Sequence, residues 1–253
     1  MALPASLAGR VALVVGGAGG IGAAAVRMLA EGGARCIVTH RPGRDKAEVA
    51  AALAARLPGE GHRALPVDVA DAASVLALRD AVLAGGGRLD ILVNAAGFTR
   101  AVPSHDLDAL DDDLIDEMFA VNWRGQFALV RAFAPALKAS GDGLVVFVSS
   151  IAGTTGTGSN LAYCAVKAGI DVLTKSLARA LAPAVRVLAV SPGVVDTDFV
   201  PGRGPDAAAK IAAGVPLRRV AGADDVAAAI AACATHLVYS TGSCIVVDGG
   251  RSL

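Results

Sequence analysis

The chain has 253 residues, enough for one large α/β domain with a sizeable buried core. Basic and acidic side chains number 23 each, so no excess charge favours nucleic acid or an anionic membrane surface as a partner. Although 54% of the residues are hydrophobic, no run of about 18 apolar residues lacks charges and glycine clusters, so we expect no membrane span. Small molecules are the expected partners.

Cysteine and histidine usage bears on cellular location and on metals. The four cysteines form no C-x-x-C pair, which favours reduced thiols in a cytoplasmic protein. The four histidines are scattered without the spacing of metal ligands, which argues against a zinc-dependent alcohol dehydrogenase. We therefore expect no metal site.

Strand and helix patterns alternate along the whole chain. Short apolar runs rich in β-branched residues predict buried strands over residues 11–15, 36–39, 64–67, 91–94, 144–149, 185–190 and 245–247. Helical periodicity covers residues 21–31, 45–57, 72–83, 112–139, 163–181 and 224–237. This alternation predicts a single doubly wound α/β domain, with a parallel sheet of about seven strands and helices on both faces.

A glycine-rich loop follows the first predicted strand and leads directly into a helix. It reads Gly16-Gly17-Ala18-Gly19-Gly20-Ile21-Gly22. The free N–H groups at a helix amino end bind pyrophosphate, and glycine lets the backbone approach it closely, so the loop favours a dinucleotide cofactor over a plain connecting turn. Two registers fit, through residues 17, 19 and 22 or through 16, 20 and 22, and the loop alone does not choose between them.

The residues after the second predicted strand bear on the choice between NAD and NADP. An acidic residue there would accept hydrogen bonds from the ribose hydroxyls of NAD, but this chain has His40. Arg41, Arg44 and Lys46 follow, and their cations would bind the 2′-phosphate of NADP. We favour NADP, while the same cations would also suit the solvated start of a helix.

Tyr163 and Lys167 lie four residues apart in a predicted helix, so both side chains share one face. A nearby ammonium favours the phenolate and is expected to lower the pKa of the tyrosine, which makes it a usable proton donor. Such pairs also arise by chance on helix surfaces. Ser150, at the end of the fifth predicted strand, adds a hydroxyl for a carbonyl oxygen on which charge develops.

Taken together, the motifs resemble those of the short-chain dehydrogenase/reductase family, in order and in spacing, over essentially the full chain. They are the glycine loop, Asn94-Ala95-Ala96-Gly97, Ser150, Tyr163-x-x-x-Lys167, Pro192-Gly193 and Asp248-Gly249-Gly250. The resemblance implies one Rossmann-fold domain over residues 1–253, with a cofactor half over residues 1–145 and a catalytic half over residues 146–253. It also selects the register through Gly16, Gly20 and Gly22.

The resemblance implies a role for each catalytic residue. Tyr163 would be the general acid in carbonyl reduction, or the base in alcohol oxidation. Lys167 would lower its pKa and bind the nicotinamide ribose, and Ser150 would orient the substrate oxygen. Asn122 matches the asparagine that holds a water in the proton relay to Lys167.

The resemblance also implies a set of cofactor-binding residues. They are Gly16, Gly19, Gly20, Ile21, Gly22, Arg41, Asp68, Val69, Asn94, Tyr163, Lys167, Pro192, Val195 and Thr197. Among them, Asp68 and Val69 would lie at the adenine and Asn94 near the nicotinamide ribose. Val195 and Thr197 would hold the carboxamide.

Three positions depart from the family pattern. Val15 stands where threonine is usual, and Ala95 where a second asparagine is usual, so the pair would make an apolar contact in place of a hydrogen bond. Many NADP-preferring relatives carry a basic residue where this chain has Gly19, which weakens the preference for NADP.

The overall pattern is most similar to 3-oxoacyl-carrier-protein reductases, so we expect an NADPH-dependent ketoreductase in a homotetramer. Residues 194–216 are expected to close over the substrate. An NAD-dependent alcohol or hydroxysteroid dehydrogenase is the alternative within enzymes. A cofactor-binding regulator without catalysis is the alternative from another class, which the intact Ser150, Tyr163 and Lys167 disfavour.

Overall fold

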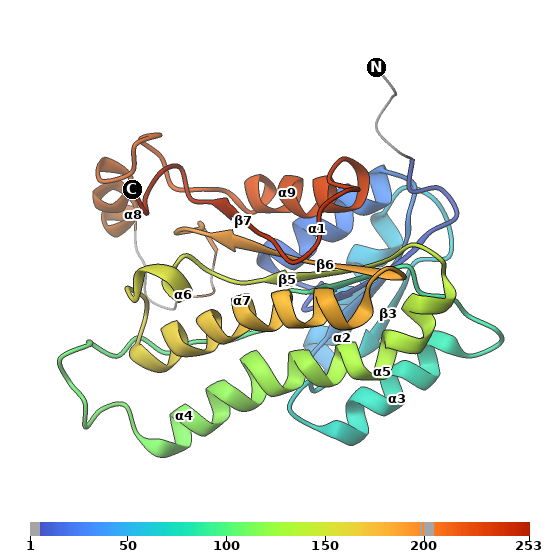
Figure 1. The fold of residues 1–253 in the computed structure, drawn as a ribbon, viewed down its shortest axis with the longest axis horizontal. Coiled ribbons are helices and arrows are strands. Elements are labelled where there is room, and N and C mark those ends of the chain that lie inside the picture. The colour runs from blue at the N-terminus through green and yellow to red at the C-terminus, as the bar shows by residue number, and fades with distance from the viewer. Residues whose placement is uncertain (1–5, 198, 200–204) are drawn as a thin grey trace.

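The computed structural model describes residues 6–197, 199 and 205–253, and within them a seven-stranded parallel sheet with helices on both faces (Figure 1). The strands are β1 (Val11–Val15), β2 (Arg35–His40), β3 (Arg63–Pro66), β4 (Ile91–Asn94), β5 (Gly143–Val148), β6 (Val185–Pro192) and β7 (Cys244–Val247). Their order is β3-β2-β1-β4-β5-β6-β7, and every neighbouring pair is parallel. The predicted doubly wound α/β fold is confirmed.

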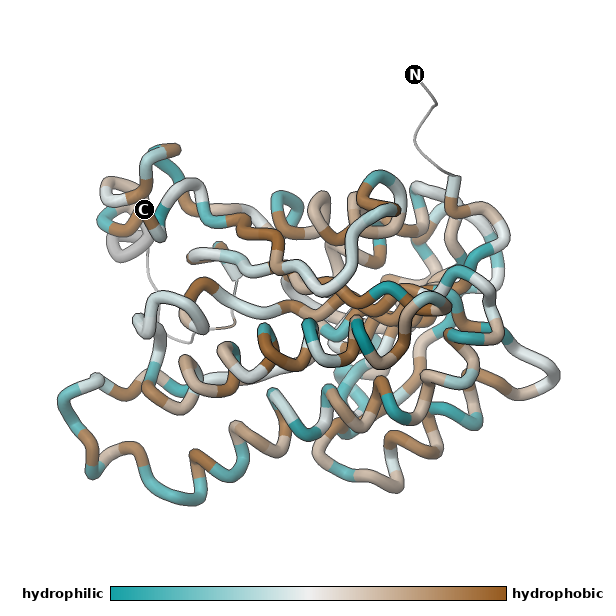
Figure 2. Tube along the Cα trace, viewed as in Figure 1, coloured by the Kyte–Doolittle hydropathy of each residue, from teal (hydrophilic) through white to brown (hydrophobic). Residues whose placement is uncertain are grey.

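The helices cover the sheet in two layers. They are α1 (Gly20–Glu31), α2 (Arg44–Arg56), α3 (Ala72–Leu83), α4 (Asp112–Phe119), α5 (Gly125–Ala139), α6 (Ala152–Thr155), α7 (Leu161–Leu181), α8 (Pro205–Ala213) and α9 (Ala223–Thr235). Buried side chains of α1, α2 and α9 pack in one core on one face, and those of α3, α5 and α7 pack in another. The central strands β1, β4 and β5 are buried along their whole length and almost entirely apolar, because both faces are covered (Figure 2).

One predicted helix, over residues 112–139, is interrupted in the structure. A π-helical turn, η1 (Ala120–Arg124), separates α4 from α5. Gly125 follows it, and a Cβ there would lie 2.5 Å from the Val69 carbonyl oxygen, so the backbones are in close contact. A π-turn inserts one residue into a helix and commonly occurs at functional sites. Here it presents Asn122 to the loop after β4.

Two short helices were not predicted. The four residues of α6, which begins shortly after Ser150, are too few to show a helical period, and α8 has a single large apolar residue, Ile211, among its alanines. Both lie at the carboxyl end of the sheet (Figure 1). No helix in the described parts of the chain is long and apolar enough to cross a membrane.

The chain leaves β1 toward β2 and β3, then returns to place β4 on the other side of β1. This reversal is the switch point at which doubly wound sheets bind ligands, beyond the carboxyl ends of the strands. The loops after β1, β4, β5 and β6 therefore converge on one place.

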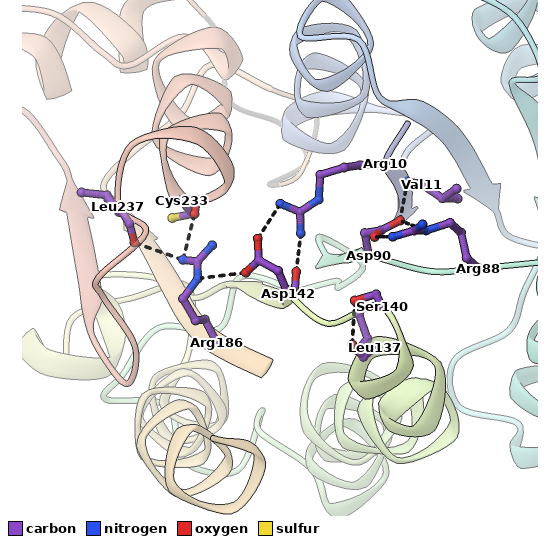
Figure 3. Close-up of polar contacts among 10 residues, drawn as sticks. All are labelled: Arg10, Val11, Arg88, Asp90, Leu137, Ser140, Asp142, Arg186, Cys233 and Leu237. Atoms are coloured by element: carbon purple, nitrogen blue, oxygen red, sulfur yellow. Dashed lines mark hydrogen bonds and ion pairs between the residues drawn. The ribbon is translucent and has the colours of Figure 1, made fainter. Parts of the chain in front are cut away.

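The amino end of the sheet carries a network of ion pairs instead (Figure 3). Arg10 donates to the Asp142 carboxylate at 2.9 Å and to its backbone carbonyl. Arg186 donates to the carbonyls of Cys233 and Leu237, at 3.1 and 3.0 Å, and its Nε lies 3.9 Å from Asp142. These contacts join the starts of β1, β5 and β6 to the end of α9.

A second part of this network centres on Asp90, which is 2% exposed. Its carboxylate accepts two hydrogen bonds from Arg88, at 2.5 and 3.0 Å, and one from the Val11 backbone N–H at 2.8 Å. The buried charge is thus paired and hydrogen-bonded, and it fixes the start of β4 beside β1.

Candidate active site

A cavity of about 1270 Å³ opens at the carboxyl end of the sheet, along the loops that follow β1, β2, β4, β5 and β6. Most of the residues predicted for the site line it. They are Gly16, Gly19, Gly20, Ile21, Gly22, Arg41, Val69, Ser150, Tyr163, Lys167, Pro192, Val195 and Thr197. The cavity can hold a dinucleotide together with a small substrate.

The glycine loop is shaped for close backbone approach. A Cβ on Gly22 would lie 2.2 Å from the Gly16 carbonyl oxygen, and a Cβ on Gly16 would lie 2.8 Å from the Ala96 nitrogen. Thr39, which was not predicted, accepts a hydrogen bond from the Gly16 N–H at 3.1 Å. These contacts require glycine at two positions of the register through Gly16, Gly20 and Gly22.

The amino end of α1 faces this cavity without a side-chain cap or an acidic residue in its first turn. The first N–H groups of a helix have no partner within the helix, and the helix dipole is positive at this end. A Cβ on Gly19 would meet no described atom within 4 Å, so the space above the loop is open. The loop and helix fit the pyrophosphate of a dinucleotide.

Beyond β2, two of the three predicted cations line the cavity. Arg41 and Lys46 face it, whereas Arg44 pairs with Glu48 at 3.3 Å on the surface of α2. His40 is 7% exposed, and its Nδ1 lies 2.7 Å from the Arg41 carbonyl oxygen, so the ring supports the turn. The residues present fit a 2′-phosphate better than a free ribose hydroxyl pair.

Tyr163 and Lys167 lie side by side on α7, with Lys167 Nζ 5.6 Å from the centre of the tyrosine ring. Burial raises the pKa of Tyr163 to about 12, and a hydrogen bond with Ser150 opposes that rise. The prediction that the ammonium lowers this pKa is therefore wrong for the protein without cofactor. Spacing on a helix places the two groups together but does not reveal how far the surrounding protein desolvates the phenol.

Lys167 is 3% exposed, and its Nζ donates to the Val148 carbonyl oxygen at 2.7 Å. Burial lowers its pKa to about 8, while the charge of Asp171 opposes the fall. At neutral pH the site therefore combines a protonated phenol with an ammonium that is held at the end of β5.

Asn160 supports this arrangement and was not predicted. It caps α7, where its Oδ1 accepts from the Tyr163 N–H at 2.7 Å, and its Nδ2 donates to the Arg100 carbonyl oxygen at 2.7 Å. It is 1% exposed. An N-cap asparagine three residues before the tyrosine was the local signal that could have indicated it.

Three predicted residues lie outside the lining of the cavity. Asn94 is fully buried and donates to the Gln126 carbonyl oxygen at 3.4 Å, below the site. Asp68 accepts from the Ala70 N–H in its own turn. Asn122 makes two hydrogen bonds of 3.0 Å with the backbone of Phe98, so its side chain braces the loop after β4.

A backbone hydrogen bond joins Val15 and Ala95, the two positions that depart from the family pattern. The Ala95 N–H donates to the Val15 carbonyl oxygen at 2.9 Å, and the Val15 side chain is fully buried. The two segments therefore stay joined without the usual threonine hydroxyl. Nearby, Asn94 Oδ1 and Gln126 Oε1 are buried without a hydrogen-bond partner among the described residues.

The substrate end of the cavity is mostly apolar. Phe98, Phe199 and Ile211 line it, and the rings of Phe199 and Tyr163 lie 6.1 Å apart. Arg251 also lines this end and was not predicted. Part of the segment expected to close over the substrate, residues 198 and 200–204, lies outside the described residues. In the described residues, no cluster of three or more side chains could hold a metal ion.

Comparison with known proteins identifies the family. The family model described as enoyl-(acyl carrier protein) reductase matches residues 16–252. The chain is similar to cis-4-hydroxycyclohexanecarboxylate dehydrogenase of Sinomonas cyclohexanicum, 41% identical over 97% of each chain. It is 34% identical to 3-oxoacyl-[acyl-carrier-protein] reductase of Escherichia coli, over 96% of this chain and 97% of that one.

A solved structure shares the fold and the length of the chain. It is a blue fluorescent protein from a metagenomic library in complex with NADPH, with a TM-score of 0.89 and 31% identity, over 98% of this chain and 100% of that one. Since the family model and the relatives cover nearly the whole chain, this protein belongs to the short-chain dehydrogenase/reductase family and is an NAD(P)-dependent oxidoreductase that acts on small molecules.

Proposed function

We propose that the protein is an NADPH-dependent ketoreductase that uses Tyr163 as its general acid. The observation that carries this proposal is the cluster of Ser150, Tyr163 and Lys167, which faces one cavity together with the glycine loop. Because burial raises the pKa of Tyr163 to about 12, the phenol holds its proton at neutral pH. A proton donor is what carbonyl reduction requires.

Each member of the cluster has a separate task. The nicotinamide supplies the hydride when the cofactor is bound. Ser150 orients the carbonyl oxygen and stabilises charge that develops on it, and Tyr163 delivers the proton to that oxygen. With the cofactor bound, Lys167 would bind the nicotinamide ribose, and its ammonium would favour loss of the phenolic proton, whereas in the protein without cofactor burial raises the pKa of the phenol. Asn122, whose side chain holds the loop at Phe98 in place, would hold a water in the proton relay to Lys167.

The cofactor assignment rests on the residues around the cavity. Gly16, Gly19, Gly20, Ile21 and Gly22 would hold the pyrophosphate. Arg41 would bind the 2′-phosphate, with Asp68 and Val69 at the adenine, Asn94 below the ribose, and Pro192, Val195 and Thr197 at the carboxamide. The solved relative in complex with NADPH also supports NADP, although the loop has Gly19 in place of a basic residue.

The test is a panel of ketones and secondary alcohols followed by the absorbance of the reduced cofactor. We expect ketone reduction with NADPH, and a fall in kcat of about 100-fold or more for Tyr163→Phe, which keeps the ring and removes the hydroxyl. Leu76→Ala, on the exposed face of α3 and outside the lining of the cavity, is the matched control and should keep full activity. Unchanged turnover in Tyr163→Phe would refute the mechanism.

A second candidate is oxidation of a secondary alcohol with NAD. The observation in its favour is the relative at 41% identity, whose name describes a dehydrogenase of a hydroxylated ring carboxylate. In that direction Tyr163 would act as the base. A higher kcat/KM with NAD and an alcohol than with NADPH and a ketone would decide for this candidate.

The location and assembly of the protein are also part of the proposal. We propose one functional domain in a cytoplasmic homotetramer. The four cysteines are free, and the alanine-rich helices α5 and α7 allow close packing between copies. On α7, Val172 is 62% exposed, as a residue of an interface would be. A monomer mass in light scattering would contradict the assembly.

A further inference from the structure

A buried acid lies one helical turn beyond Lys167, and the proposed mechanism does not use it. Asp171 on α7 is 8% exposed. Its Oδ1 accepts a hydrogen bond from Ser149 Oγ at 2.6 Å and one from Cys244 Sγ at 3.3 Å. Its Oδ2 is buried and has no hydrogen-bond partner among the described residues. Such a group is costly to bury, so a role other than packing is indicated.

Asp171 is joined to the catalytic residues through the end of β5. Ser149 lies between Val148, whose carbonyl accepts from Lys167 Nζ at 2.7 Å, and Ser150. The Ser149 hydroxyl also lies 3.3 Å from the Lys167 carbonyl oxygen. The end of β5 therefore meets the catalytic face of α7 through a short series of hydrogen bonds that ends at Asp171.

The charge of Asp171 also acts on Lys167. Burial lowers the pKa of the lysine, and Asp171 is the one charged group that opposes this fall. Tyr163 on α7 and Cys244 on β7 are the other titratable groups that contact the pair. Other charged residues on elements packed against α7 are Asp112, Asp113, Asp116 and Glu117 on α4, Arg124 on η1 and Arg186 on β6. None of these perturbs Lys167.

We propose that Asp171 is a positioning residue, which holds the end of β5 against α7 through Ser149 and keeps the Lys167 side chain an ammonium beside Tyr163. It touches neither substrate nor cofactor, and it acts through Lys167 and Ser150. The inference deepens the proposed function, because the ammonium it maintains is the one assigned to the site. A purely structural aspartate would affect stability alone.

The experiment titrates Lys167 directly in the protein without cofactor. The chain has five lysines, so carbon-13 labelling at lysine Cε gives a small set of signals, and Lys167→Arg identifies the one of interest. In Asp171→Asn, which keeps the size of the side chain, we expect the Lys167 signal to titrate lower by about one pH unit. Cys244→Ala is the matched control, because it removes a neighbour of Asp171 and keeps its charge.

The kinetic arm separates positioning from charge. Ser149→Ala keeps the charge of Asp171 and removes its link to β5, so kcat should fall about tenfold while the KM for the ketone changes less than about twofold. In Asp171→Asn the alkaline limb of kcat should shift to lower pH with the lysine. If the wild type reduces no carbonyl, the proposed function fails and the titration arm still stands.

A Lys167 titration in Asp171→Asn within about 0.3 pH unit of the wild type would overturn the inference, whatever the activity. So would a Ser149→Ala variant with wild-type kcat. If Asp171→Asn does not fold, the Ser149→Ala result decides alone, since that change removes one hydroxyl and no charge. Retained turnover in the wild type together with either negative result would leave the proposed function intact.

Discussion

At the amino end of the sheet, the buried and half-buried charges of Asp90, Arg10 and Arg186 each meet an opposite charge. Asp90 is paired with Arg88, and Asp142 is shared between Arg10 and Arg186. At the carboxyl end, burial shifts the pKa of Tyr163 up and that of Lys167 down, and neither group has an ion-pair partner among the described residues. The charges at the amino end hold neighbouring strands together, whereas the polar groups at the carboxyl end are placed for catalysis at some cost in stability.

The difference follows from what each end must leave open. The charged groups at the amino end pair with one another, and one donor, Nη2 of Arg186, is left without a hydrogen-bond partner among the described residues. At the carboxyl end, the glycine loop and a cavity of about 1270 Å³ leave room for a cofactor, and cations that line it, among them Arg41, Lys46 and Lys167, form no ion pair among the described residues. Changes at the amino end should therefore lower stability and spare activity, whereas changes at the carboxyl end should also affect cofactor binding or catalysis.

The largest effect on stability is expected at the amino end. Asp90→Ala should lower the free energy of unfolding by about 3 kcal/mol, because it leaves the Val11 N–H without an acceptor and Arg88 without its counter-charge. Urea unfolding measures this change. The kcat/KM should stay within about twofold of the wild type, since Asp90 lies at the opposite end from the cavity.

The control for this prediction is an ion pair on the surface. Asp80→Ala breaks the contact of the exposed Asp80 with the half-buried Arg79, and should cost less than about 0.5 kcal/mol. Equal losses in the two variants would show that the amino-end network is no more than surface charge.

The glycine loop should be nearly as sensitive. In Gly22→Ala the new Cβ would lie 2.2 Å from the Gly16 carbonyl oxygen, so the loop must shift, at a cost of about 2 kcal/mol. We expect a lower melting temperature and about thirtyfold weaker NADPH binding, measured by fluorescence titration. Gly19→Ala has open space around its Cβ and should melt like the wild type. A normal melting temperature for Gly22→Ala would contradict the close contact.

Removal of the buried cation at the carboxyl end, Lys167, should change how the stability of the protein depends on pH. Burial lowers the pKa of folded Lys167 from 10.5 to about 8, so between these values the unfolded chain keeps a proton that the folded chain has lost. Stability from this group therefore rises with pH and is lost as pH falls through 8. The free energy of unfolding of Lys167→Met, measured relative to that of the wild type, should therefore be about 2 kcal/mol higher at pH 7 than at pH 9.5.

The measurement is the difference between the two proteins in urea unfolding at each pH. Burial also raises the pKa of cysteines such as Cys36 and Cys233. Their titration affects both proteins equally, so it cancels in the difference. A difference between wild type and variant that is the same at both pH values would show that Lys167 titrates normally in the folded protein.

The sequence predicted the sheet well because its strands are buried on both faces, so each appears as a short apolar run. It also predicted where Ser150 and Tyr163 meet, since the end of a parallel strand and the first turns of a helix are places that local patterns mark. The π-turn at Ala120–Arg124 escaped prediction, because the periodicity of residues 112–139 is hardly changed by one inserted residue.

Contacts between distant residues were also missed, for a physical reason. Asn160 and Arg100 are 60 residues apart in sequence, and Asp171 and Cys244 are 73 apart. No local spacing encodes such pairs. The pKa of Tyr163 was missed for the same reason. It is determined by burial among surrounding elements, and the four-residue spacing from Lys167 carries no information about that burial.

The smallest predicted effect concerns the choice between NADP and NAD. Arg41 favours NADP, whereas Gly19 weakens that preference. Arg41 lines the cavity and forms no ion pair among the described residues, so its guanidinium is available to a 2′-phosphate. Arg41→Gln should raise the KM for NADPH about tenfold and leave that for NADH within about twofold. Arg44→Gln removes a cation already paired with Glu48 and is the matched control. Equal rises for NADPH and NADH in Arg41→Gln would mean that this cation supports the turn and does not select the cofactor.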